Sequence, residues 1–483
     1  TLLVILIVTI SYQARSAFTR YELQVSISSA SVSPREVVSD IRNSLYEVFP
    51  EAVTDRDVGR NVRNLVSTLA SKTVAPIKKR TEASRQSYVP LSDQADRYLK
   101  GLATRTKSFD LPTWQVTDGK LVLSPARLHD LLQSISVEGD TTDQASVLTL
   151  NRETSSILLT LPDGTYRVNI IESDGLRVSR LLAWTPAQDQ AGRLLVIHTP
   201  EYQRSVSDVE IAAIEALKSK ALLRQAMNWA LYFNADSSEP ELAGVFAAFI
   251  GSVLIVLVTM IFVLPVGVAA AVYLEEFAPK SWFNRLATAT INNLAAVPTI
   301  VFGLMGAAFF INGIQVTLPF TDITLQLGGG MGRGWPIVGG LVLGLIALPT
   351  LIISARTAIA AVPRSTREAA IGLGASKLQS VTHHVLPEAA PGILTGSIIA
   401  LAQSLGEAAP LLLLGMFAFV GDAPSGVNDR SSALPVLIFQ WSTRPERAWE
   451  ANTAAAVVIL LFLMLAMNAL AIWIRMKLSK RFS

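Results

Sequence analysis

Residues 367–387 read REAAIGLGASKLQSVTHHVLP and lie between two long apolar stretches. Charged and small residues dominate the segment, and two glycines, Gly372 and Gly374, interrupt it. Glycine commonly ends a helix and proline cannot continue one, so both residue types mark helix boundaries. The segment therefore predicts a short helix from about Arg364, a turn at the two glycines, and a second helix that stops at Pro387.

The composition of the chain predicts a membrane protein. Half of the 483 residues are hydrophobic and 16% are charged, which is too apolar for a soluble protein of this length. A helix that crosses a bilayer needs about 20 apolar residues. The windows that supply such helices are 243–274, 286–321, 334–355, 393–406 (continuing past Glu407 to 421) and 451–474.

The chain opens on the apolar residues TLLVILIVTI, about half the length of a membrane-crossing helix. We interpret residues 1–11 as the end of a first helix whose start is missing. A cleaved signal peptide, whose apolar core is equally short, is the alternative. With this segment the sequence predicts six transmembrane helices.

Basic residues predict the orientation of these helices, because connections rich in Lys and Arg face the cytoplasm. Such residues gather in alternate connections and in the C-terminal tail, 476–483. They are Lys280, Arg285, Arg356, Arg364, Arg367, Lys377, Arg475, Lys477, Lys480 and Arg481. We therefore expect both termini and the segment 367–387 in the cytoplasm, and residues 12–242 on the outer side.

Residues 12–242 have the composition of a soluble domain, and their patterns predict an α+β fold. Apolar residues at helical spacing predict helices within 31–49, 55–70 and 207–233. Asp163 and Gly164 predict a hairpin turn. The runs that predict strands are 120–124, 146–150, 155–161, 166–171 and 193–198. No constellation of catalytic residues is recognisable here, so the role of this domain stays open.

The segment 367–387 resembles the EAA loop of ABC importer permeases. The pattern is E-A-A, three residues, Gly, nine residues, then a position followed by x-Leu-Pro. The residues that meet it are Glu368, Ala369, Ala370, Gly374, His384, Leu386 and Pro387, with His384 where the family usually has Ile. The resemblance implies a cytoplasmic coupling loop at 363–391, in which Arg367, Glu368 and the small residues dock onto a separate ATPase. An ordinary charged turn between two membrane helices is the alternative.

The chain carries no nucleotide-binding loop, since G-x-x-x-x-G-K-[ST] does not occur in it. We therefore expect a non-catalytic subunit that binds no cofactor, with ATP and Mg on the partner ATPase. The chain has no cysteine, and the adjacent His383 and His384 lack a third ligand, so no metal site is expected. A formal net charge of +3 does not favour nucleic acid as a partner.

Three further stretches are similar to those of phosphate importer permeases of the PstA type. They are LPVGVAAAVYLEEFAP at 264–279, NLAAVPTIVFGLMG at 293–306 and SLGEAAPLLLLG at 404–415. The resemblance implies an all-α polytopic membrane domain at 243–475 with the type I ABC importer permease fold, in a bacterial inner membrane. It also implies four partners: a second permease similar to PstC, an ATPase dimer similar to PstB, a periplasmic phosphate-binding protein similar to PstS, and phosphate itself.

A phosphate ion inside a membrane needs hydrogen-bond donors, because an unpartnered ion is very costly in a medium of low dielectric constant. A helix break at Pro298 and Thr299 would offer backbone N–H groups. Asn292 and Asn293 add side-chain donors close by in the sequence. These four residues are candidates for the translocation pathway.

Gln403, Ser404 and Glu407 complete the candidate pathway. Because Glu407 repels an anion, we expect it to pair with a cation or with N–H groups and to switch the path, or to lie at its outer mouth. A buried glutamate that only fixes helix packing is the alternative. Gly340 and Gly344 form a small-x-x-x-small pair, which favours close packing of helices.

The sequence thus favours the permease subunit of an ATP-driven phosphate importer that works by alternating access. A permease for another oxyanion is one alternative. A membrane receptor with an extracytoplasmic sensor domain is another, although no cytoplasmic segment resembles an output domain such as a kinase.

Overall fold

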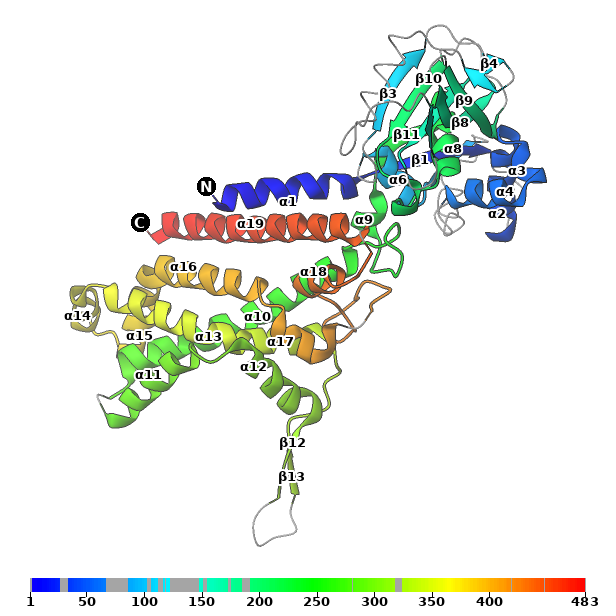
Figure 1. Ribbon diagram of the computed structural model, residues 1–483. Coiled ribbons are helices and arrows are strands. Elements are labelled where there is room, and N and C mark those ends of the chain that lie inside the picture. Colours follow the sequence, from blue (N-terminus) through cyan, green and yellow to red (C-terminus); the bar gives the residue numbers. More distant parts are fainter. Residues whose placement is uncertain are drawn as a thin grey trace. The chain divides into compact units, whose positions relative to one another are not determined.

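The computed structural model divides the chain into two compact units (Figure 1). The helical unit comprises Thr1–Phe18 and Trp229–Ser483, and the inserted unit comprises Thr19–Asn228. The structure describes residues 2–26, 34–66, 86–101, 106–111, 116–117, 119–121, 147–150, 154–172, 175–184, 192–279, 281–317, 324–417, 419–446 and 448–482.

The helical unit is built from helices joined by π-helical turns. The helices are α1 (Leu2–Phe18), α9 (Trp229–Phe233), α10 (Phe246–Val272), α11 (Trp282–Leu294), α12 (Thr299–Gly306), α13 (Pro336–Ala361), α14 (Arg364–Gly372), α15 (Lys377–Ser380), α16 (Leu386–Leu405), α17 (Ala409–Leu411), α18 (Leu434–Ser442) and α19 (Ala448–Phe482). The π turns are η2 (Tyr273–Phe277), η3 (Ala307–Asn312), η4 (Val381–Val385) and η5 (Leu412–Met416). A hairpin of β12 (Ile314–Thr317) and β13 (Thr324–Leu327) follows η3.

Four helices of the described chain are long and apolar enough to cross a membrane: Phe246–Phe277, Pro336–Ala361, Lys377–Leu405 and Ala448–Lys477. A fifth span exists if α11 and α12, which are bent by 102° at their break, count as one. The predicted helix at residues 1–11 is part of the 17-residue α1. The number of six spans stays a prediction.

Two of the predicted windows do not form single helices. Within 286–321 the chain breaks between α11 and α12, where Pro298 caps α12, and after Asn312 it enters the β12–β13 hairpin. Within 393–421, α16 ends at Leu405, and Gly415 adopts a φ of 87° inside η5. A positive φ is a conformation that glycine tolerates and a helix does not, so the apolar run past Glu407 is interrupted a second time at Gly415, after the break that follows Leu405.

Close helix packing organises the core of the helical unit. A Cβ at Gly340 would lie 2.5 Å from Val258 Cβ, and one at Gly344 would lie 2.6 Å from Phe262 Cδ1. Thr259 Oγ1 donates to the carbonyl of Gly340 at 3.0 Å. These contacts hold α10 against α13, as the small-residue spacing predicts.

Helices α1 and α19 lie side by side, with Ala14 and Ala17 buried in the same hydrophobic cluster as Ala455. The start of α1, the end of α19 and α14 lie at one end of the helical unit (Figure 1). Because Ala14 and Ala17 continue the packed face of α1, the helix runs on to Phe18, beyond the predicted boundary at residue 11.

The inserted unit carries helices and antiparallel strands. Its helices are α2 (Pro34–Val48), α3 (Glu51–Thr54), α4 (Arg56–Asn64), α6 (Asp93–Leu99), η1 (Glu201–Gln203) and α8 (Asp208–Ser219). One sheet has the order β11-β1-β2, and a second has the order β3-β10-β7-β8-β9-β5-β4 with β6 paired to β8. The strands are β1 (Thr19–Ser26), β2 (Gln86–Pro90), β3 (Thr106–Leu111), β4 (Val116–Thr117), β5 (Lys120–Leu121), β6 (Val147–Thr149), β7 (Ser156–Leu161), β8 (Gly164–Glu172), β9 (Gly175–Ala183), β10 (Gly192–Ile197) and β11 (Leu223–Met227).

The predicted elements of the inserted unit are confirmed where the structure describes them, with three corrections. The helix predicted within 55–70 ends at Asn64, and Val66 forms a β-bridge with Leu91. The turn between β7 and β8 is Pro162–Asp163, since Gly164 already pairs with Leu161. The predicted helix 207–233 is wrong: α8 ends at Ser219, Ala221 has a φ of 56°, and β11 pairs with β1 before α9 begins. The predicted residues 31–33, 67–70, 122–124, 146 and 280 lie outside the described parts of the chain.

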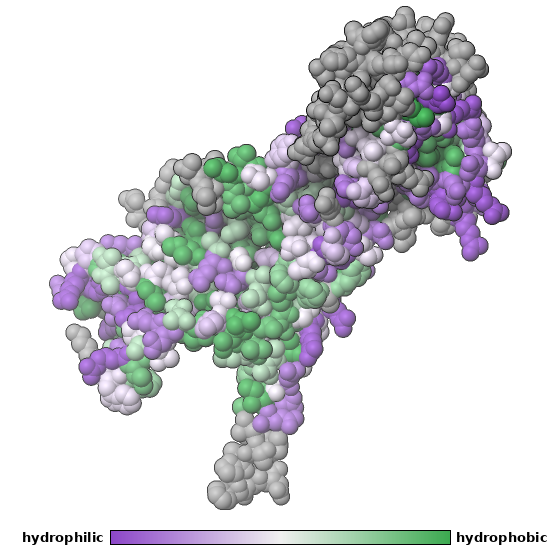
Figure 2. Space-filling model, in the orientation of Figure 1, coloured by the Kyte–Doolittle hydropathy of each residue, from purple (hydrophilic) through white to green (hydrophobic). Residues whose placement is uncertain are grey.

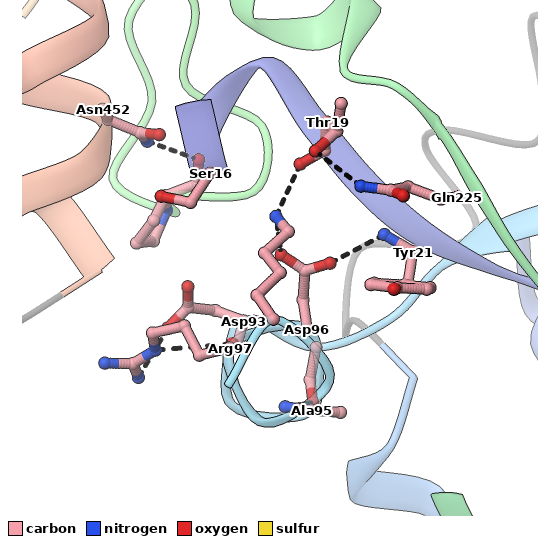
Figure 3. A network of polar contacts seen from close by, with 12 residues as sticks. Ser16, Thr19, Tyr21, Asp93, Ala95, Asp96, Arg97, Gln225 and Asn452 are labelled. Atoms are coloured by element: carbon pink, nitrogen blue, oxygen red, sulfur yellow. Dashed lines mark hydrogen bonds and ion pairs between the residues drawn. The ribbon is translucent and has the colours of Figure 1, made fainter. Parts of the chain in front are cut away.

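The two ends of the inserted unit are adjacent, because Thr19 pairs with Met227 in the β1–β11 ladder. A polar network fixes the start of β1 (Figure 3). Gln225 Nε2 donates to Thr19 Oγ1 at 3.1 Å, and the Tyr21 N–H donates to Asp96 Oδ1 at 2.7 Å. Lys100 pairs with Asp96 and donates to the Thr19 carbonyl. Adjacent ends are typical of a domain inserted into another fold.

Candidate functional site

The segment that resembles the EAA loop folds as two helical pieces around a tight turn. α14 ends at Gly372, Gly374 has a φ of 88°, and no described atom beyond its chain neighbours lies within 4 Å of a Cβ at Gly374. Ser376 then caps α15 in a capping box with Gln379. The positive φ at Gly374, and not a lack of space for a side chain, is therefore the reason why this position requires glycine.

The second helix does not stop at Pro387, which corrects the prediction. α15, η4 and α16 form one continuous helix over Lys377–Leu405. Proline removes a backbone donor and its ring crowds the carbonyl four residues earlier. The π turn η4 lies directly before Leu386, whose N–H donates to Val381 five residues back, and this wider turn relieves the crowding.

The tip of the loop presents apolar side chains that the sequence reasoning missed. Leu373 is 91% exposed, Leu378 is 60% exposed and Ile371 is 53% exposed. The surrounding end of the helical unit is hydrophilic (Figure 2). In the sequence, the signal for these exposed side chains was the presence of large apolar residues within a charged, glycine-containing loop. Large apolar side chains that are exposed in one polar loop are a feature of protein interfaces.

The members of the E-A-A triplet differ in burial. Ala370 is 5% exposed, whereas Glu368 and Ala369 are exposed. In the described chain no side chain pairs with the Glu368 carboxylate. Glu368 is thus free to contact a partner protein.

Arg367 points into the permease, which corrects its predicted role as a docking residue at the rim. Its Nε and Nη2 donate to Glu276 Oε1 at 2.8 and 2.6 Å. Its Nη1 donates to the Val362 carbonyl at 2.7 Å, and its Nη2 to the Ile359 carbonyl at 2.9 Å. The guanidinium therefore binds the end of α13 and the turn that follows α10.

The first half of the candidate pathway surrounds the helix break. Asn292, Asn293 and Pro298 are exposed in the single chain, and Thr299 is partly buried. Pro298 is the N-terminal cap of α12 and offers no side-chain hydrogen bond. The Val301 N–H donates to the Pro298 carbonyl at 2.9 Å, so the N–H groups of Thr299 and Ile300, which no side chain caps, are the ones that the break offers to a ligand.

The second half lies at the end of α16. The exposed Gln403 accepts a hydrogen bond from Thr350 Oγ1 at 3.3 Å, whereas the hydroxyl of the buried Ser404 donates to Ala400 of its own helix at 2.9 Å. Glu407 is partly buried, and its expected pairing with a cation is not formed among the described residues.

The two halves occupy neighbouring elements of the helical unit. A Cβ at Gly303 in α12 would lie 2.7 Å from the Cα of Pro410, the proline of α17. Glu407 precedes Pro410 by three residues, and Thr299 opens α12. The structure thus joins the broken helix to the segment that carries Glu407, although more than 100 residues of sequence separate the two.

Known proteins match the helical unit. The family described as "Binding-protein-dependent transport system inner membrane component" matches residues 263–483. The phosphate transport system permease protein PstA 1 of Mycobacterium tuberculosis is 30% identical over 243 residues, which cover 49% of this chain and 72% of that protein. PstA of Mycobacterium leprae is 30% identical over 260 residues, which cover 53% and 78%.

The chain belongs to the PstA-like family of ABC importer permeases. This permease is therefore a multi-pass inner-membrane protein. Another relative is the "Probable ABC transporter permease protein YqgI" of Bacillus subtilis, which is 30% identical over 205 residues. The match covers 42% of this chain and 64% of that protein.

Solved structures show weaker likenesses to the permease. The methionine ABC transporter MetNI has a TM-score of 0.35 at 20% identity, over 47% of this chain and 93% of that chain. A bacterial ABC transporter that imports the acidic polysaccharide alginate has a TM-score of 0.38 at 14% identity, over 50% and 80%. The family assignment rests on the sequence matches.

Proposed function

We propose that this chain is the permease subunit of an ATP-driven importer of inorganic phosphate, and that its coupling loop, residues 363–391, docks onto a separate ATPase. The observation that carries the proposal is the loop tip, where Leu373 is 91% exposed on a hydrophilic surface. An interface would bury this side chain and Leu378, and the exposed Glu368 would add a charged contact at its rim.

Exposed polar residues support a second permease as a partner. Polar side chains in membrane helices avoid lipid and face protein or a water-filled path. Asn292 and Asn293 on α11 and Gln403 on α16 are exposed in the single chain. A second permease would cover these residues and would complete the pathway between the two subunits.

The relatives named as phosphate permeases support phosphate as the solute. Neutral donors at the break before α12 suit a tetrahedral oxyanion, since backbone N–H groups at a helix start bind anions. The same donors would accept sulfate or molybdate. An extracytoplasmic binding protein would deliver the solute and ATP binding would alternate the access of the pathway.

The direct test is reconstitution of the permease with its second permease, ATPase and binding protein in liposomes. We expect radiolabelled phosphate to enter the liposomes on ATP addition, with little inhibition by excess sulfate or molybdate. Uptake of another oxyanion in preference to phosphate would assign the permease to that solute. The lack of ATP-dependent uptake of any of the three would refute the proposal.

The coupling role is tested by Glu368→Lys, with Glu446→Lys as the matched control on an exposed glutamate outside the loop. We expect Glu368→Lys to lower uptake and to weaken ATPase binding, while the control leaves both unchanged. Normal uptake and binding in Glu368→Lys would remove Glu368 from the docking surface.

A further inference from the structure

The π turn η2 directly follows α10. Three consecutive residues of this turn each contact a different basic side chain. Glu275 pairs with Arg356 of α13 at 3.3 Å, and Glu276 pairs with Arg367 of α14 at 2.6 Å. The Lys377 Nζ of α15 lies 5.1 Å from the ring centroid of Phe277. Consecutive residues of a helical turn point in different directions, so one turn can contact three separate elements.

The central pair is the strongest of the three contacts. The side chains of Glu276 and Arg367 are 9% and 20% exposed, and the contact is a paired, charge-assisted hydrogen bond. Water screens such a pair little, and removal of one partner leaves an uncompensated buried charge. The pair therefore holds α14 firmly against the end of α10.

The same turn also reaches α11. Arg356 Nη1 donates to Thr288 Oγ1 at 3.2 Å while its Nη2 contacts Glu275. Arg356 thus links η2, α13 and α11. By contrast, a Cβ at Gly372 or Gly374 of the loop tip would meet no described atom within 4 Å. The glycine turn at the tip of the loop thus has open space around it, whereas α14 at the base of the loop is bound to η2.

We propose that Glu275, Glu276 and Phe277 are positioning residues that transmit movement of the coupling loop to α10, α11 and α13. A displacement of α14 by the ATPase pulls Glu276 through Arg367, and the continuous helix Phe246–Phe277 carries this movement across the membrane. The transport side of this inference, which is the effect of these residues on phosphate import, rests on the proposed function. The mechanical side, which is the transfer of movement from the loop to α10, requires only that ATP moves the loop.

The mechanical side is tested in the complete complex with two spin labels, at Ser365→Cys on α14 and Phe246→Cys at the other end of α10. Both positions are exposed, and the chain has no cysteine of its own. We expect ATP to change the distance between the labels in the wild-type background and to leave it unchanged with Glu276→Ala. An ATP-induced change that persists in Glu276→Ala overturns the proposal, as does no change in the wild-type background.

The transport side is tested by the ratio of phosphate imported to ATP hydrolysed. We expect Glu276→Ala to lower this ratio about fivefold or more, at the lower end of typical coupling between sites, while Glu446→Ala leaves it unchanged. Phosphate uptake by the wild type with an unchanged ratio in Glu276→Ala overturns the proposal and leaves the proposed function intact. Lack of uptake by the wild type refutes the proposed function. In that case the distance between the two spin labels still tests the transfer of movement from the loop to α10.

A fold defect is separated from lost transmission by a double variant, Glu276→Cys with Arg367→Cys. A bifunctional thiol reagent with a reducible spacer replaces the ion pair by a covalent link. We expect the ratio to rise on cross-linking and to fall again on reduction in the same sample. A ratio that does not respond to either treatment contradicts transmission through this pair.

Discussion

The guanidinium of Arg367 and the carboxylate of Glu276 join positions 91 residues apart in the sequence, with two hydrogen bonds of 2.8 and 2.6 Å. The guanidinium also binds the carbonyls of Ile359 and Val362 at the end of α13. Helix ends carry unpaired carbonyls that basic side chains satisfy. Arg367 thus satisfies carbonyls at the end of α13 and links α14 to the turn that follows α10.

Arg367→Lys should destabilise the permease, because a lysine ammonium cannot reach the carboxylate and both carbonyls in the same planar arrangement. We expect a loss of about 1–3 kcal/mol in the free energy of unfolding, as for hydrogen bonds to charged groups. Thermal unfolding in detergent measures the loss. Arg364→Lys, on an exposed residue of the same helix, is the control, and an equal loss in both variants would contradict the anchoring role.

Leu373→Asp should weaken ATPase binding without affecting the fold. The side chain is 91% exposed, so its replacement should change stability by no more than about 0.5 kcal/mol. Loss of an apolar contact at the centre of an interface commonly costs about 2 kcal/mol, or more than tenfold in affinity. Titration of the permease with the ATPase measures this loss. Leu327→Asp, on an exposed leucine of β13, should bind normally, and equal binding by both variants would exclude Leu373 from the interface.

Asp236→Asn should change how stability depends on pH. Burial raises the pKa of Asp236 above its ordinary value of 3.8, although Trp441 Nε1 donates to its carboxylate at 2.9 Å. A carboxyl with a raised pKa in the folded state contributes stability below its ordinary pKa and loses it as the pH rises through the folded value. Asparagine keeps the acceptor oxygen without the charge. We therefore expect the variant to gain in melting temperature over the wild type as the pH rises from about 4 to about 7.

Asp429→Asn provides a control of opposite sign for this pH dependence. Hydrogen bonds from the side chain and the backbone N–H of Ser425 hold the pKa of Asp429 below its ordinary value. The stability that Asp429 contributes is present above the ordinary pKa and is lost as the pH falls. Identical pH profiles for Asp236→Asn and the wild type would contradict the role of the buried carboxyl.

Gly340→Ala should loosen the contact between α10 and α13. The added Cβ would lie 2.5 Å from Val258 Cβ and 2.8 Å from the carbonyl oxygen of Ile255, and backbone cannot move aside cheaply. We expect a destabilisation of about 1–3 kcal/mol, which is typical of overpacking. Thermal unfolding measures it against Gly426→Ala, where a Cβ would meet no described atom within 4 Å. Equal stability of the two variants would contradict the packing role of Gly340.

Local patterns in the sequence predicted much of the fold. Apolar windows located α10, α13 and α19, and the small-residue pair at Gly340 and Gly344 indicated where two of them pack. Pro298 indicated the break before α12. These features depend on residues close together in the chain, and such residues determine helix length, helix ends and close approach.

Other predictions failed because distant residues compete with local preference. The amphipathic pattern at 207–233 favours a helix, yet residues 223–227 form β11 because β1, more than 190 residues earlier, offers a strand to pair with. Helix 377–405 continues through Pro387 because the π turn η4 accommodates the ring. The end of α16 at Leu405 depends on Gly406 and the segment that follows it, so the apolar run past Glu407 was misleading.

Hydrophobicity, charge asymmetry and the E-A-A spacing are local properties of the sequence. They identify a membrane permease, and the E-A-A spacing favours a loop that docks onto a partner ATPase. The direction of each side chain in that loop follows only from the tertiary fold. Arg367 and Glu368 are neighbours in sequence, yet helical geometry turns Arg367 inward to Glu276 and leaves Glu368 exposed. The direction of a side chain depends on what packs beside its helix, and that neighbour comes from a distant part of the chain.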